Sequence, residues 1–115
     1  MKSPITTHVL DITRATPASG MEVTLELSSS SREWREIARG RTDADGRINT
    51  LISGSTAPAP GTYRLVFQTG AYFQSLGTAT FYPFVEIVFE LKDSSKQHHV
   101  PLLISPFGYS TYRGS

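Results

Sequence analysis

Hydrophobic and polar residues alternate along most of this chain, which is the pattern of β-strands with one buried face. In the clearest segment, MEVTLEL at 21–27, every second residue is Met, Val or Leu, and the residues between them are Glu or Thr. Similar segments predict about eight strands in all, at residues 7–12, 21–27, 33–42, 47–52, 62–69, 85–91, 98–105 and 108–115.

Turn signals separate these segments and indicate the fold class. The clearest is TDADGR at 42–47, where two Asp side chains can hydrogen-bond to the local backbone and Gly46 can adopt a positive φ. One short helix is predicted at 70–77, closed by Gly77. Because turn signals recur about every 8 to 12 residues, the chain is predicted to be all-β, a two-sheet antiparallel sandwich.

Length, charge and cysteine content narrow the class of protein. With 115 residues, we expect one domain spanning 1–115. The net charge of +1 gives no basic face, so no nucleic-acid partner is expected. No apolar segment approaches the roughly 18 residues of a membrane span, so no membrane partner is expected either. We expect a cytoplasmic protein, or a periplasmic or peroxisomal one if a targeting segment has been removed.

Three histidines are the main candidates for chemistry, since the chain has no cysteine and no familiar catalytic motif. His8 shares a strand face with Leu10 and Ile12. It is either a half-buried packing residue or a neutral imidazole that can act as a base near pH 7. His98 and His99 are adjacent and must point to opposite strand faces, so at most one of them enters a given pocket.

Two arginines are candidates for substrate binding. Arg47 follows the Asp45-Gly46 turn, and Arg113 lies close to the end of the sequence. Each is either a solvated strand residue or a fixed cation whose planar fork can bind a carbonyl-rich substrate. The histidine spacing is not a zinc signature, so we predict no metal and no cofactor.

Three segments resemble the transthyretin-related family, and the likeness extends over nearly the whole chain. They are THVLDI at 7–12, TDADGR at 42–47 and HVPLLISPFGYSTYRGS at 99–115. The final Tyr-Arg-Gly-Ser resembles the hydrolase branch of that family and is missing from its hormone carriers. The resemblance implies a sandwich of two four-stranded antiparallel sheets with one short helix. It also implies a homotetramer, a dimer of dimers, with active sites in a central channel.

The resemblance further implies an activity and a set of site residues. The activity is hydrolysis of 5-hydroxyisourate to 2-oxo-4-hydroxy-4-carboxy-5-ureidoimidazoline in urate degradation. The family's catalytic positions fall on His8, Arg47 and His99. The terminal motif implies substrate binding by Tyr112, Arg113, Gly114 and Ser115. The alternative is a carrier of small aromatic ligands without catalysis.

One departure from the family pattern concerns the second histidine motif. Many members have His-Tyr-His before Val-Pro, where this chain has Gln97-His98-His99. The matched position is His99, so the departure leaves the expected catalytic set unchanged and argues only against a role for a histidine at position 97.

Overall fold

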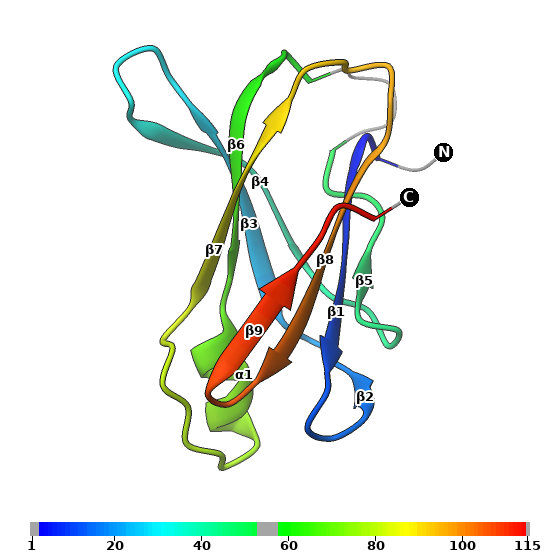
Figure 1. The fold of residues 1–115 in the computed structure, drawn as a ribbon, viewed down its shortest axis with the longest axis vertical. Coiled ribbons are helices and arrows are strands. Elements are labelled where there is room, and N and C mark those ends of the chain that lie inside the picture. The colour runs from blue at the N-terminus through cyan, green and yellow to red at the C-terminus, as the bar shows by residue number, and fades with distance from the viewer. Residues whose placement is uncertain (1–2, 53–57, 115) are drawn as a thin grey trace.

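Two β-sheets pack face to face in the computed structural model, which describes residues 3–52 and 58–114 (Figure 1). The one helix of the described residues, α1, spans Thr69–Ser75 and lies at one end of the sandwich. The strands are β1 (Ile5–Asp11), β2 (Thr16–Pro17), β3 (Glu22–Ser28), β4 (Trp34–Arg41), β5 (Arg47–Ile48), β6 (Gly61–Phe67), β7 (Val85–Leu91), β8 (His98–Ser105) and β9 (Gly108–Thr111). The predicted all-β sandwich with one short helix is confirmed.

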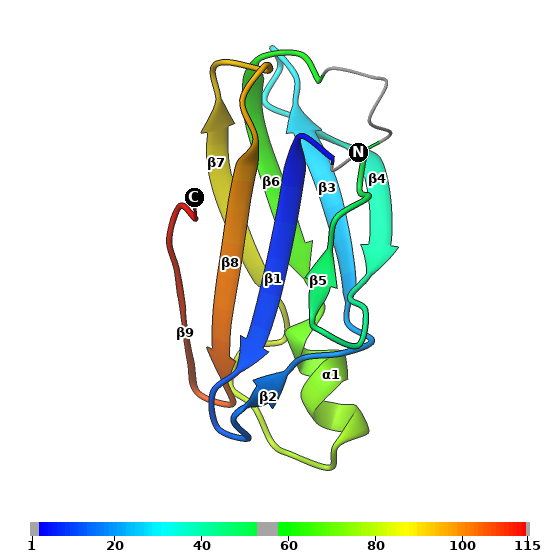
Figure 2. The same ribbon diagram turned by 90° about the vertical axis from the view of Figure 1, so that its right-hand side faces the viewer.

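The first sheet has the strand order β2-β1-β8-β9, and β5 also pairs with β1 (Figure 2). Two-residue strands β2 and β5 follow one another along the same edge of β1, so this sheet has five strands where four were expected. β1 and β8 are parallel, which differs from the fully antiparallel prediction. Parallel neighbours need a long crossover connection, and the chain between β1 and β8 supplies one by passing through the second sheet.

The second sheet is antiparallel throughout, with the order β4-β3-β6-β7. Its inner face follows the predicted alternation. Val23 and Leu25 on β3 and Leu65 and Phe67 on β6 are fully buried, as is Tyr63. Burial of such side chains is the main favourable contribution to folding, at about 1.5–3 kcal/mol for each large aliphatic or aromatic residue.

The buried face of β1 carries Ile5, Thr7, Val9 and Asp11, and it is the face opposite to Leu10. Thr7 and Asp11 are fully buried, whereas Ile12, just beyond the strand, is 57% exposed. The Asp11 carboxylate accepts hydrogen bonds from the backbone N–H groups of Thr13 and Arg14 and from the Tyr72 hydroxyl. Because these partners satisfy the buried carboxylate, Asp11 can lie on the inner face with Ile5 and Val9, which are also fully buried. His8 therefore lies on the outer face of the first sheet.

Three segments of the structure differ clearly from the predicted elements. The strand expected at 47–52 is reduced to Arg47–Ile48. Beyond it the backbone bonds to Ser3 instead of a strand: the Ser3 N–H donates to the Asn49 carbonyl, and the Ile52 N–H donates to the Ser3 hydroxyl. The strand expected at 108–115 ends at Thr111. Residues 16 and 17, expected in a loop, form β2. No helix among the described residues is long and apolar enough to cross a membrane.

Candidate active site

A row of three residues crosses the outer face of the first sheet at His99. On one side, Thr6 of β1 is the register partner of His99 on β8. On the other, Gly114 pairs with His99 through an isolated bridge, in which the Gly114 N–H donates to the His99 carbonyl at 2.9 Å. Paired residues in neighbouring strands point to the same face, so this row positions the His99 ring between β1 and the C-terminal segment.

A second row lies two residues further along β1. His8 pairs with Arg47 on β5 and with Pro101 on β8. His8 and His99 are therefore diagonal neighbours on one face, and Arg47 stands beside His8 on the far side from β8. Both histidines are half-buried and Arg47 is exposed. The structure thus brings together the three residues predicted to be catalytic.

The turn before Arg47 fixes the position of the Arg47 backbone. The Asp43 carboxylate accepts hydrogen bonds from the backbone N–H groups of Arg47, at 3.0 Å, and Asp45, at 2.9 Å. These bonds, with the one to Arg47 contributing most, hold the pKa of Asp43 below its usual range. Gly46 has φ +75° and its carbonyl accepts the Val9 N–H at 2.7 Å. A side chain at this position would meet the Val9 carbonyl, which explains the glycine.

The His99 ring is held from two sides. Its Nδ1 lies 2.8 Å from the Thr6 hydroxyl, in a hydrogen bond whose donor depends on the tautomer. Its other edge faces Gly114, where an added Cβ would lie 2.5 Å from His99 Cδ2. Only a residue without a side chain leaves room for the ring in this position.

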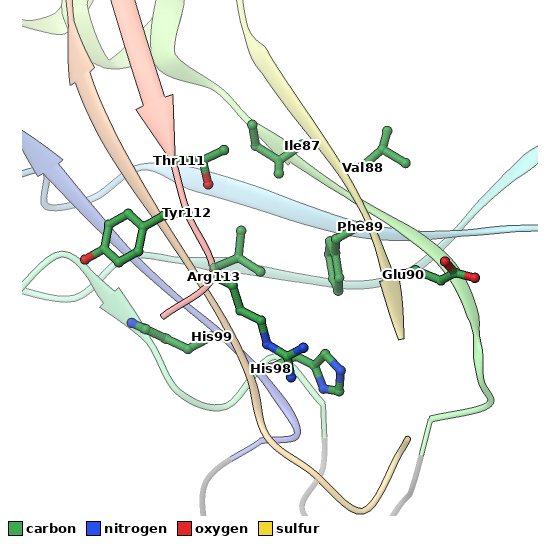
Figure 3. Close-up of a pocket in the computed structure, with 10 residues that line it drawn as sticks. Ile87, Val88, Phe89, Glu90, His98, His99, Thr111, Tyr112 and Arg113 are labelled. Carbon is green, nitrogen blue, oxygen red and sulfur yellow. The ribbon is translucent and has the colours of Figure 1, made fainter. Parts of the chain in front are cut away.

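His98 and Arg113 lie on the other side of the β8–β9 pair (Figure 3). With Phe89 and Glu90 of β7 they line part of a cavity of about 340 Å³ between the edges of the two sheets, and His99 and Tyr112 also border this cavity. His98 is only 6% exposed, and its Nδ1 is hydrogen-bonded to the Lys96 carbonyl at 3.0 Å. His98 thus faces away from His8 and Arg47.

The C-terminal residues divide between these two sides. Tyr112 points to the side of His99 and is 60% exposed, whereas Arg113 points towards His98 and the cavity (Figure 3). Gly114 touches the His99 ring, and Ser115 lies outside the described residues. Arg113 consequently does not share the face of the three residues predicted to be catalytic, and its role in substrate binding stays a prediction.

Sequence reasoning missed two residues of this region, Thr6 and Asp43. Thr6 is two residues before His8, so strand alternation could have put both on one face. Its pairing with His99 depends on the register of two strands separated by most of the chain, which no local pattern encodes. Asp43 was recognised only as a turn residue. Within residues 3–52 and 58–114, no three His, Asp or Glu side chains are grouped as a metal site.

The fold and these rows define a transthyretin-like sandwich. The crystal structure of sea bream transthyretin in complex with thyroxine superposes with a TM-score of 0.90, at 33% identity, covering 97% of this chain and 95% of that one. The structure of Klebsiella pneumoniae 5-hydroxyisourate hydrolase gives a TM-score of 0.85 at 36% identity, covering 96% of this chain and 98% of that one.

Sequence comparison identifies the family. The profile of the HIUase/Transthyretin family matches residues 5–114. A mouse (Mus musculus) protein named 5-hydroxyisourate hydrolase is 44% identical over 114 residues, which cover 98% of this chain and 96% of that protein. The chain belongs to the HIUase/Transthyretin family, as its terminal motif predicts.

Proposed function

We propose that the protein hydrolyses 5-hydroxyisourate to 2-oxo-4-hydroxy-4-carboxy-5-ureidoimidazoline in urate degradation. The observation that carries the proposal is the register that sets His8 beside Arg47 and diagonal to His99 on one sheet face. The 44% identity to the mouse 5-hydroxyisourate hydrolase supports the substrate. Two imidazoles and a guanidinium are suitable groups for opening a planar ring that carries several carbonyls.

In the proposed reaction, one of the two histidines takes a proton from water as the water oxygen attacks a ring carbonyl carbon. The ring C–N bond then breaks, and the departing nitrogen receives the proton. Arg47 holds the substrate carbonyls and stabilises the negative charge that develops on the attacked oxygen. A positioned general base typically contributes about 10²- to 10⁴-fold in rate. Tyr112 is on the same side as His99 and is proposed to contact the substrate.

A carrier function is the competing hypothesis. The sea bream transthyretin structure that superposes at a TM-score of 0.90 contains thyroxine, so a protein with this fold can bind an aromatic ligand. The pairing of His8 with Arg47 favours hydrolysis, because a carrier of an apolar ring needs no cation beside an imidazole.

We also infer that the protein assembles as a homotetramer, a dimer of dimers. His8, Arg47 and His99 lie on the outer face of a sheet, and a second chain facing them would exclude water from the site. Light scattering should then give a mass of about four times 12.6 kDa. A fully active monomer would contradict this inference.

The functional proposal is tested by following the ultraviolet absorbance of freshly generated 5-hydroxyisourate. Catalytic amounts of the protein should accelerate its decay well beyond the spontaneous rate. Decay at the spontaneous rate, together with tight binding of thyroxine, would instead support the carrier hypothesis.

A further inference from the structure

We propose that Thr6 is a positioning residue for His99, whose hydroxyl holds the imidazole through Nδ1 in each protonation state that the reaction requires. The inference deepens the proposed function, since it rests on His99 taking part in proton transfer. Thr6 itself does not contact the substrate in this proposal and acts on the reaction only through the His99 side chain.

The geometry makes Thr6 a rigid partner. Its hydroxyl lies 2.8 Å from His99 Nδ1, and the residue is only 2% exposed. It lies on β1, which is paired with β8 over seven consecutive residue pairs. A β-branched side chain has few accessible χ1 rotamers, so the hydroxyl cannot swing away at low cost. Strand pairing and rotamer preference together fix the oxygen against the ring.

The chemistry of a hydroxyl suits a ring that must gain and lose a proton. A hydroxyl can donate to the bare Nδ1 of one neutral tautomer and accept from Nδ1–H of the other tautomer or of the imidazolium. A carboxylate could only accept, and would favour the charged ring throughout. Thr6 can therefore stay bonded while Nε2 exchanges a proton.

Gly114 completes the constraint from the opposite edge. An added Cβ there would lie 2.5 Å from His99 Cδ2 and 3.2 Å from Pro101 Cγ. The ring is thus confined between a hydrogen bond on β1 and backbone of the C-terminal segment. Loss of the hydroxyl should let the ring rotate away from Thr6 without removing the imidazole itself.

The strand offers a matched control in Thr7. This residue is also a fully buried threonine on β1, and its hydroxyl also bonds to β8, donating to the Val100 carbonyl at 2.6 Å. Thr7 belongs to the inner face, so its side chain points away from His8 and His99. Replacing either threonine with valine removes one buried hydroxyl and keeps the shape of the side chain.

The experiment compares Thr6→Val, Thr6→Ser and Thr7→Val by steady-state hydrolysis of 5-hydroxyisourate. Thr6→Val should lower kcat by about tenfold to a hundredfold, part of the contribution of a positioned base, with KM nearly unchanged. Thr6→Ser should recover most of kcat, and Thr7→Val should keep it. Wild-type kcat in Thr6→Val, no recovery in Thr6→Ser, or an equal loss in folded Thr7→Val would each overturn the proposal.

Nuclear magnetic resonance supplies a readout that does not depend on activity. In the wild-type protein, a slowly exchanging Thr6 hydroxyl proton should show a cross-peak to the His99 ring. Thr6→Val should change the ¹⁵N shifts of the His99 ring nitrogens, and Thr7→Val should not. Absence of the wild-type cross-peak overturns the proposal even if Thr6→Val does not fold. A wild-type protein that shows the cross-peak and leaves 5-hydroxyisourate untouched would refute the proposed function alone.

Discussion

The outer faces of the two sheets carry their charges differently. On the second sheet, Arg64 of β6 contacts Glu26 and Glu86 and stacks its guanidinium 4.2 Å from the centre of the Trp34 ring. On the first sheet, Arg47 is fixed through its backbone, and its guanidinium makes no ion pair within the described residues.

This difference separates structural charges from those available for a ligand. The Arg64 guanidinium already contacts two carboxylates and an aromatic ring, so it is poorly available to bind a substrate. Arg47 stands beside His8 and forms no ion pair among residues 3–52 and 58–114, so its guanidinium can bind a carbonyl-rich ligand. The predictions below test this contrast, from the largest expected effect to the smallest.

The largest effect is expected from the histidines of β8. His99→Ala should lower kcat/KM by about 10²- to 10⁴-fold, because it removes a proposed proton-transfer group. His98→Ala should leave kcat/KM nearly unchanged and cost roughly 1 kcal/mol of stability through its lost hydrogen bond to Lys96. Steady-state kinetics and thermal melting of both variants check this. Equal loss of activity in the two would show that the wrong face was assigned.

The two arginines give the next contrast. Arg47→Ala should lower kcat/KM by about 10²- to 10³-fold, since removing one group that stabilises an oxyanion typically costs this much. Arg64→Ala should preserve kcat/KM and lower the melting temperature, because it breaks contacts with Glu26 and Trp34. The account fails if Arg47→Ala is as active as Arg64→Ala at equal folded fraction.

A smaller effect is expected at Gly114. Gly114→Ala should push the His99 ring aside, and a misplacement of this kind lowers kcat by about tenfold to a hundredfold. Gly108→Ala on β9 is the control, because an added Cβ there meets only Ser105 Oγ at 3.6 Å. Kinetics of the two alanine variants test the contact. A fully active Gly114→Ala enzyme would mean that the ring tolerates displacement.

The smallest effect concerns the turn before Arg47. The folded-state pKa of Asp43 is lowered, so its contribution to stability is present above the ordinary aspartate pKa and is lost as pH falls through the folded value. Asp43→Ala should slightly lower the melting temperature at pH 7 and raise KM, and the difference in melting temperature should vanish in strong acid.

Asp93 provides the control for that turn. It accepts hydrogen bonds from the backbone N–H and hydroxyl of Ser95, which lower its pKa in the same direction. Asp93→Ala should show the same pH dependence of melting with an unchanged KM. A KM increase of the same size in both variants would refute a specific role of the Asp43 turn.

Much of the fold could be predicted from the sequence because strand alternation is a local property. The buried residues of β3 and β6, including Leu25 and Phe67, follow from period two alone. Alternation alone does not settle β1, where both faces carry apolar residues and the buried Thr7 and Asp11 depend on side-chain partners. Those partners come from distant parts of the chain, so no window of sequence contains them.

The candidate site shows the same limit. His8, Arg47 and His99 were found through their match to family motifs. Their spatial relation depends on β1 pairing with β5 and β8, and that register is set by the whole sandwich. Thr6 was missed for this reason, since its importance comes only from its partner on β8.

The most direct test of the central claim is a crystal structure with a planar, non-hydrolysable analogue of 5-hydroxyisourate. The account predicts that the ring lies on the outer face of the first sheet, with its carbonyls at Arg47 and its reactive carbon near His8 and His99. An analogue bound instead in the cavity beside His98 and Arg113, away from Arg47, would contradict it.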